Sequence, residues 1–300
     1  MVYSKKILSV ILLVSCIAVL AGCAGGNGGS KYTYEDENSY LTGGTAITDL
    51  IRTIEIDWYG GSVSVAYHDG DTVEFSETSE NELTEAMTLR YKVTDEALVI
   101  KYAKSGTRLS SDHKKSLTVY IPKGTALRDV EIETVSADIS VDHLTAAQTE
   151  IKTVSGSIDM KYMSILGTAD ITSVSGTINA SFASALTGLY IETVSGSASA
   201  VVNKTEEFDI ETISGEVTVD FASLPQRGGM ESVSGDITLY LPEEVGFTLV
   251  FDTTSGKASI EHKFFVADDG SYVYGNGEYK YDADTVSGDI FIKKHANAEN

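Results

Sequence analysis

The chain has 300 residues, with 22 basic and 44 acidic side chains, a net charge of −22 at pH 7 and only two cysteines. This balance argues against a nucleic-acid partner, because phosphates need basic side chains, and against direct adhesion to anionic lipid headgroups. The low cysteine count excludes a disulfide framework, so the fold depends on its core and its backbone ladders.

The N-terminal segment has the pattern of a secretory signal. Lys5 and Lys6 form a positive region, and the apolar run at 7–20 is too short for a comfortable membrane span. The next residues, LAGC at 20–23, resemble the bacterial lipobox, which implies cleavage before Cys23 and acylation of that residue, for example with palmitate. We therefore expect a signal peptide at 1–22 and a lipid anchor at Cys23. The alternative is an ordinary signal peptide in which Cys23 is incidental.

The segments that follow predict one continuous extracytoplasmic β domain behind a spacer. Residues 23–47 contain much glycine, serine and acid, and we expect a flexible tether there. Residues 48–125 alternate as short strands, which predicts an N-terminal β cap and a first coil. Such a cap is needed because an open strand edge invites aggregation. Residues 126–295 form the repeat region.

A ten-residue phrase, for example IETVSGSASA at 191–200, recurs along the chain. Its glycines are spaced by 20, 20, 19, 20 and 21 residues, followed by a longer step of 32. So regular a spacing indicates stacked units that cannot bury their apolar faces alone. The copies begin at residues 132, 151, 171, 191, 210, 230, 251 and 283, and a degenerate copy begins at residue 56.

Each phrase is predicted to form a strand, a corner and a second strand. The inward parity changes across Val-Ser-Gly, and side chains alternate faces along a strand, so the chain must bend there. We expect the glycine to supply a positive φ, with Ala137 replacing it in one copy. Identical strands at a constant step favour an all-β parallel β-helix, or β-solenoid, of about 20-residue coils. A meander of antiparallel hairpins is the alternative.

The longer step contains the segment DDGSYVYGNGEYKYD at 268–282. Its alternating tyrosines on either side of Gly-Asn-Gly predict a C-terminal hairpin. We expect this hairpin either to hide the end of the solenoid or to offer a contact surface for a glycan or protein. The candidate contact residues are Tyr272, Tyr274, Tyr279 and Tyr281.

Catalytic chemistry has little support in the sequence. Serine occupies the same corner position in seven copies, whereas an enzyme needs one nucleophile, so we expect a hydroxyl ladder. The five histidines are scattered without metal-ligand spacing. Lyases and hydrolases that use β-helices place carboxylates or a basic residue in one cleft, and no such isolated cluster interrupts the repeat. We expect no enzyme, no cofactor and no assigned metal.

Two positions of the phrase stack into polar stripes. The second position predicts an acidic stripe of candidate ligands for Ca²⁺ or another hard cation, against the alternative of a solvated face. The ninth position is small and polar, from Ser64 to Ser259, and such a face binds sugars or merely faces solvent. The candidate cation ligands are Glu192, Glu211, Glu231 and Asp252.

The lipobox, the recurring T-V-S-G-x-I, the VYIP strand at 119–122 and the closing TVSGDIFI at 285–292 are similar to a known bacterial family. It is the putative-adhesin β-strand-repeat family, which is toastrack-like, and the resemblance covers about residues 50–292. It implies a β-helix-like stack and a non-catalytic, surface-anchored adhesin or cell-envelope binder that contacts a cell-surface glycan or envelope protein. The alternative is a structural or stress-sensing scaffold that binds a membrane partner of its own cell.

Overall fold

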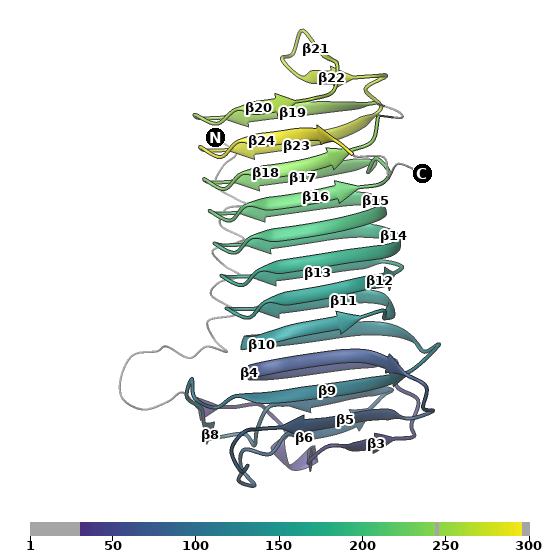
Figure 1. The fold of residues 1–300 in the computed structure, drawn as a ribbon, viewed down its shortest axis with the longest axis vertical. Helices are drawn as coiled ribbons and strands as arrows, with labels where there is room; N and C mark the ends of the chain where they lie inside the picture. The colour runs from purple at the N-terminus through teal and green to yellow at the C-terminus, as the bar shows by residue number, and fades with distance from the viewer. Residues whose placement is uncertain (1–30, 244–245, 296–300) are drawn as a thin grey trace. The chain divides into compact units, whose positions relative to one another are not determined.

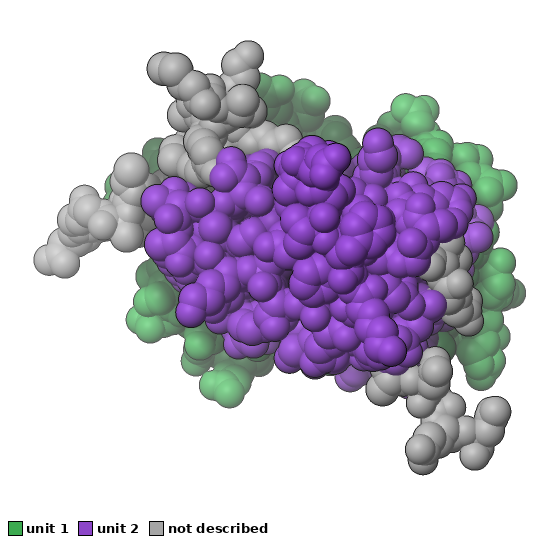
Figure 2. Space-filling model, turned by 90° about the horizontal axis from the view of Figure 1, so that it is seen from above, with its two compact units in different colours: residues 1–160 green, residues 161–300 purple. Residues whose placement is uncertain are grey.

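The computed structural model describes residues 31–243 and 246–295. Apart from one short 3₁₀ helix, η1 (Glu37–Ser39), the regular structure in these ranges is all β-strand. The chain divides into two compact units, residues 1–160 and 161–300, which Figure 2 shows in different colours. The expected signal peptide, Cys23 and the first part of the expected tether lie outside the described residues. Within the described ranges, no helix has the length and apolar character needed to span a membrane.

Unit 1 is built around the degenerate copy of the phrase. Strand β4 (Thr53–His68) pairs in parallel with β10 (Ala126–Asp142), with Ile56 opposite Ile132. Strand β10 pairs in parallel with β11 (Thr145–Thr153). The predicted parallel β-solenoid is therefore confirmed, and the antiparallel meander is excluded.

The other edge of β4 carries the cap of unit 1. Strands β7 (Ala97–Lys101) and β9 (Lys115–Pro122) pair in parallel with the two halves of β4 and form a further coil. Antiparallel strands then cover that coil, because β5 lies against β9 and β6 against β7. The other cap strands are β1 (Lys31–Tyr32), β2 (Leu41–Thr42), β3 (Thr45–Ile47), β5 (Val73–Thr78), β6 (Arg90–Thr94) and β8 (Thr107–Arg108).

The expected flexible tether is wrong for its second half, residues 31–47. Strands β1, β2 and β3 pair antiparallel with β8, β6 and β5. The reason is the packing of aromatic rings. The Tyr32 ring packs against the Tyr102 ring with a centroid distance of 6.3 Å, and the Tyr32 hydroxyl donates to the carbonyl of Asp57. Burial of these rings outweighs the polar composition that suggested a tether.

Unit 2 repeats the same coil. Its long strands β14 (Ile178–Thr193) and β15 (Ala198–Thr212) pair in parallel and in register over most of their length. The other strands are β12 (Ile158–Ile165, which begins in unit 1), β13 (Thr168–Ser173), β16 (Val217–Phe221), β17 (Arg227–Ser232), β18 (Ile237–Leu241), β19 (Phe247–Thr253), β20 (Ala258–Ile260), β21 (Phe264–Val266), β22 (Tyr272–Tyr274), β23 (Tyr279–Thr285) and β24 (Ile290–Lys294).

The last coil of the chain is not the last coil of the stack. Strands β23 and β24 pair in parallel with β17 and β18 on one side and with β19 and β20 on the other. Figure 1 shows this coil in yellow between its two green neighbours. The chain therefore passes over one coil position, forms β19 and β20, and returns through β21 and β22 to fill the position that it left open.

The core of unit 2 consists of columns of inward side chains. Ile191, Ile210 and Met230 occupy equivalent positions of paired strands and are fully buried. In the adjacent column Gly228 stands beside Phe208, and a Cβ on Gly228 would overlap the Phe208 ring. The missing side chain lets that ring approach Tyr281, at 5.5 Å. A column of the core therefore combines large aromatic side chains with a glycine and is still closely packed.

Candidate functional site

The Thr-Val-Ser-Gly corner satisfies its own polar groups. Thr212 Oγ1 accepts the N–H of Gly215 at 2.9 Å and donates to the Gly215 carbonyl at 3.0 Å, and Thr193 does the same for Gly196. The buried threonine therefore replaces the backbone partners that are lost where the strand bends.

The corner serines form the expected hydroxyl ladder. Ser195 donates to the carbonyl of Val174 at 3.2 Å, and Ser214 donates to the carbonyl of Val194 at 3.1 Å, in each case in the preceding coil. Ser155, Ser234, Ser255 and Ser287 likewise donate to backbone carbonyls of a neighbouring coil, so the repetition sets none of these serines apart. The ladder is structural.

The reason for the corner glycine differs from the expected one. The seven corner glycines of the regular copies, from Gly156 to Gly288, are not among the residues with positive φ. Instead, a Cβ on Gly215 would come closer than 3.0 Å to the carbonyl oxygen of Gly196, a distance that real Cβ atoms essentially never show. Glycine is required by the close approach of successive coils. Ala137 is accepted with an ordinary φ, beside Gly61, whose φ of 104° gives that corner a different backbone.

The acidic stripe has a different order from the predicted one. The register runs Glu192, Glu211, Glu231, Asp284 and Asp252, because the last coil of the chain separates Glu231 from Asp252. Glu211 is only 8% exposed. Among the described residues, no group of three or more histidine, cysteine or carboxylate side chains is arranged to hold a metal ion. Cation binding by the stripe stays a prediction.

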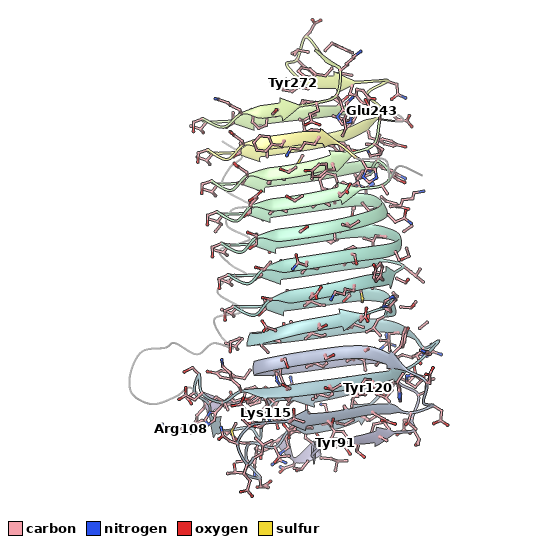
Figure 3. All side chains as sticks on the ribbon, in the orientation of Figure 1. Tyr91, Arg108, Lys115, Tyr120, Glu243 and Tyr272 are labelled. Carbon is pink, nitrogen blue, oxygen red and sulfur yellow. The ribbon has the colours of Figure 1, made fainter. Side chains whose placement is uncertain are left out.

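The predicted tyrosine hairpin needs a correction. The hairpin at the end of unit 2 joins β21 to β22, whereas β22 and β23 lie on opposite edges of β19. Tyr281 is fully buried, and its hydroxyl donates to the carbonyl of Pro225, so it belongs to the core. Tyr272 remains part-exposed at the tip of unit 2, where Figure 3 labels it.

The polar face of unit 2 contains one departure from the repeat. The ninth position follows the register Asn179, Ser199, Thr218, Thr238, Phe291 and Ser259. Phe291 thus replaces the small polar residue of every other coil. Tyr240 points to the same side on the neighbouring strand, and Lys293 Nζ lies 5.5 Å from the Tyr240 centroid and 5.6 Å from that of Phe291. We call Tyr240, Phe291 and Lys293 the aromatic platform.

The platform is supported by the core beneath it. Leu239, Ile290 and Ile292 alternate with the platform residues on the same strands and are fully buried. Both rings are half-buried, so each keeps part of its surface accessible. Flat, rigidly held rings with a cation beside them are able to stack on the C–H face of a sugar or on a protein side chain.

Unit 1 contains a buried ion pair that sequence reasoning missed. Lys115 Nζ lies 2.6 Å from Glu77 Oε2 and 2.6 Å from the carbonyl oxygen of Met87, and it also donates to the Tyr102 carbonyl. The lysine side chain is 1% exposed. Figure 3 labels Lys115 in unit 1. Its ammonium lies 4.8 Å from the Trp58 ring and 4.1 Å from that of Tyr102. Burial lowers the pKa of Lys115 to about 8, and Glu77 opposes this shift.

The alternation of inward and outward side chains along β9 was the sequence signal for the buried lysine. Lys115, Leu117 and Val119 share one parity, and the two apolar residues are fully buried, so the lysine must also point inward. The site is closed to solvent and its three donors are all used. It therefore belongs to the core of the cap and offers no open position for chemistry.

His262 lies buried beneath the terminal hairpin of unit 2. It is 2% exposed, its Nε2 lies 3.2 Å from the Leu241 carbonyl oxygen, and its ring packs against Phe247 and Tyr274. Burial lowers the pKa of His262 below its usual 6.5. The neutral form is therefore favoured in the folded state.

Acidification is expected to destabilise this end of the chain through His262. Because the pKa of His262 is lower in the folded than in the unfolded chain, the contribution is complete above about pH 6.5 and is lost as the pH falls below it. The loss approaches at most about 1.4 kcal/mol per pH unit. His262→Gln keeps a donor but does not titrate. Between neutral and acidic pH, the melting temperature of the wild type should fall more than that of the variant. Equal falls in the two proteins would contradict this role.

These features define a β-solenoid whose recurring corner threonines and serines hydrogen-bond to backbone groups. The family model described as Toastrack DUF4097 matches residues 51–293, and the chain belongs to that family. The toastrack-like resemblance of the sequence is thus confirmed.

Two solved structures are similar to this chain. One is a putative cell adhesion protein from Clostridium sporogenes, 14% identical, which aligns over 85% of this chain and 99% of its own with a TM-score of 0.29. The other is a putative adhesin from Bacteroides fragilis, 9% identical, which aligns over 84% and 96% with a TM-score of 0.46. No curated protein matches the chain.

Proposed function

We propose that this protein is a non-catalytic binding module, held outside the cytoplasm by a lipid on Cys23, that uses the aromatic platform to contact a cell-surface glycan or an envelope protein. The observation that carries the proposal is the replacement of a small polar residue by Phe291 in the ninth-position column of unit 2, next to Tyr240 and Lys293. Two part-exposed aromatic rings with a lysine beside them form an apolar patch with a cationic edge, and a contact role accounts for such a patch.

The sequence supports the location. The LAGC motif at 20–23 follows a short apolar run and precedes a glycine-rich segment, an arrangement that suits a lipid anchor with a spacer. The net charge of −22 opposes direct contact with an anionic membrane surface, so the acyl chains supply the attachment. Cys23→Ser is the variant that separates anchoring from binding, because it leaves the described residues unchanged.

The chemistry of the platform favours a sugar or a flat protein surface. Stacking of a partner's aromatic side chain on one of these rings would contribute about 0.5–1.5 kcal/mol beyond the area that it buries. Asp220 and His295 form a hydrogen bond beside Tyr240, which places polar groups at the rim of the rings. Apolar rings with a polar rim are typical of sites that orient a polar ligand.

The test uses the chain without residues 1–23, added to intact host cells, whole bacteria and purified cell-wall glycan, with Ca²⁺ and with a chelator. We expect saturable binding to one of these, weakened about tenfold by Phe291→Ser. Val201→Ser, which removes an exposed apolar residue on the same face, is the matched control and should leave binding unchanged.

Three outcomes of this experiment would change the interpretation. Loss of binding with chelator would indicate that the acidic stripe takes part. Binding that is insensitive to Phe291→Ser would overturn the role of the platform. Absence of binding to all three surfaces would overturn the adhesive function and favour a scaffold that binds a membrane partner of its own cell.

A further inference from the structure

The hairpin of β21 and β22 covers one edge of β19 and is held by few contacts. Strand β22 pairs with β19 over three residues, and β21 pairs with β22 alone among the described strands. Phe264, Phe265 and Val266 of β21 are 41%, 60% and 58% exposed, so this strand buries little apolar surface. Figure 1 shows the hairpin at the end of unit 2. A two-stranded hairpin is marginally stable by itself, so this one depends on the contacts of β22.

Tyr274 holds β22 against the coil, and His262 is the closer of its two ring partners. The Tyr274 ring lies 4.7 Å from the His262 ring and 5.4 Å from the Phe247 ring, measured between centroids. The Tyr274 hydroxyl donates to the Glu243 carbonyl at 2.8 Å. Because His262 also packs on Phe247, at 5.4 Å, the imidazole lies within the contact between the hairpin and β19.

Protonation of His262 leaves one buried N–H without an acceptor. A carbonyl oxygen can only accept, so the Nε2 atom that faces Leu241 carries the proton of the neutral imidazole. The Nδ1 atom is buried and has no hydrogen-bond partner in the described part of the chain. The imidazolium therefore has a donor at Nδ1 that water satisfies only after the hairpin has moved away.

The charges around His262 do not offset this cost. The carboxylates of Glu243 and Glu261 favour the cation, but Glu243 is paired with the Lys294 ammonium at 2.5 Å and Glu261 accepts the Lys294 backbone N–H at 3.2 Å. Lys294 itself disfavours the cation, and the adjacent Lys263 adds a second positive charge. Burial outweighs the attraction of the carboxylates and keeps the pKa of His262 below its usual 6.5.

We propose that the hairpin is an acid-operated cover of unit 2: protonation of His262 releases β22 from β19 and opens the outer edge of β19. The contact that must break is small, and such local openings need much less free energy than global unfolding. The uncovered residues 247–249 then present free N–H and C=O groups, while β23 keeps the other edge of β19 paired. The cover depends neither on the aromatic platform nor on the lipid anchor.

Hydrogen exchange, measured by mass spectrometry at about pH 7.5 and about pH 5 on the chain without residues 1–23, tests the opening. After correction for intrinsic exchange rates, the protection of residues 247–249 and 272–274 should fall below about pH 6.5, by at most about tenfold per pH unit. Peptides from β14 and β15 should keep their protection. Unchanged protection of the hairpin would overturn the proposal, as would an equal loss in β14 and β15.

Two variants assign the change to His262. His262→Gln keeps a donor for the Leu241 carbonyl but does not titrate, so hairpin protection should no longer depend on pH. Glu243→Gln removes a carboxylate that favours the imidazolium, so the pKa of His262 should fall further and the loss in acid should become larger. If His262→Gln already opens the hairpin at neutral pH, Glu243→Gln decides, and an equal or smaller loss than in the wild type would contradict the proposal.

A disulfide between β19 and β22 tests whether the two strands separate. Thr248 and Val273 lie directly opposite each other, and Cα atoms in such antiparallel pairs are about 4.5–5.5 Å apart, which suits a disulfide. The chain without residues 1–23 contains no cysteine of its own. Thr248→Cys/Val273→Cys should keep its protection in acid when oxidised and lose it when reduced. Loss of protection in the oxidised form would show that exchange does not need release of β22, against the proposal.

Discussion

Replacing Glu77 with leucine should cost unit 1 about 3–5 kcal/mol of folding free energy at neutral pH. The substitution leaves the ammonium of Lys115 buried, with its remaining donors on the carbonyls of Met87 and Tyr102 but with no opposite charge. Desolvation of an unpaired charge is costly, and the pKa of Lys115, already lowered to about 8, should fall further. The cost cannot exceed the free energy of deprotonating Lys115, because the chain can bury the neutral amine instead of the unpaired charge.

The double variant Lys115→Met/Glu77→Leu is the matched control. It replaces both partners by apolar side chains of similar size, and such replacements of buried pairs are often neutral or stabilising. We therefore expect chemical denaturation to show a large loss for Glu77→Leu and recovery of most of that loss in the double variant. If the single variant were as stable as the wild type, the pair would contribute nothing to the cap.

The same pair predicts a pH dependence of the same sign as that of His262, in a more alkaline window. The pKa of Lys115 is about 8 in the folded chain, against 10.5 for an ordinary lysine, so the neutral amine is favoured on folding. Stability of the wild type relative to the double variant should therefore rise between about pH 8 and pH 10.5. A flat difference across this window would show that Lys115 stays fully charged in the folded protein.

Gly215→Ala should destabilise the stack of coils in unit 2 by about 3 kcal/mol, the upper end of typical overpacking costs. The added Cβ meets the carbonyl oxygen of Gly196, which is backbone and has no rotamer to change. The two coils must separate, and the ladders of β15 with β14 and with β16 must stretch with them. Thermal or chemical denaturation measures the loss.

Two neighbouring substitutions test the cause of that loss. Ser214→Ala removes the exposed hydroxyl that donates to Val194, and we expect a cost of about 1 kcal/mol or less. Ala137→Gly converts the exceptional corner of unit 1 to the common residue and should cost only about 0.5–1 kcal/mol, through backbone entropy. If Gly215→Ala were as mild as Ser214→Ala, coil separation would not be the reason for glycine at this position.

The sequence predicted the coil and its in-register stacking, because Ile191 and Ile210 recur at equivalent positions whichever coil they meet. The spacing also located the irregular segment between Gly256 and Gly288. It could not reveal that β23 and β24 enter between β17–β18 and β19–β20. All copies of the phrase present nearly the same edges, so local pairing hardly distinguishes the possible orders. The acidic stripe was given the wrong order for that reason.

The features of the candidate site were likewise predicted only in part from the sequence. The corner serines and their ladder followed from their repetition, and the inward parity of Lys115 was readable in β9, although its partner Glu77 was not. Phe291 was readable as the ninth residue of the copy that begins at residue 283, but the stacking order was needed to place it between Thr238 and Ser259 and beside Tyr240.

The sequence by itself determined what each coil is, because the alternation of apolar residues and the spacing of the glycines act within about 20 residues. The tertiary structure alone decided which coil lies beside which and which charges become buried. Those outcomes depend on contacts between residues far apart in the chain, such as Lys115 with Glu77 and Phe208 with Tyr281. Because the backbone edges of the coils are nearly identical, the order of the coils depends on how their side chains pack along the whole core.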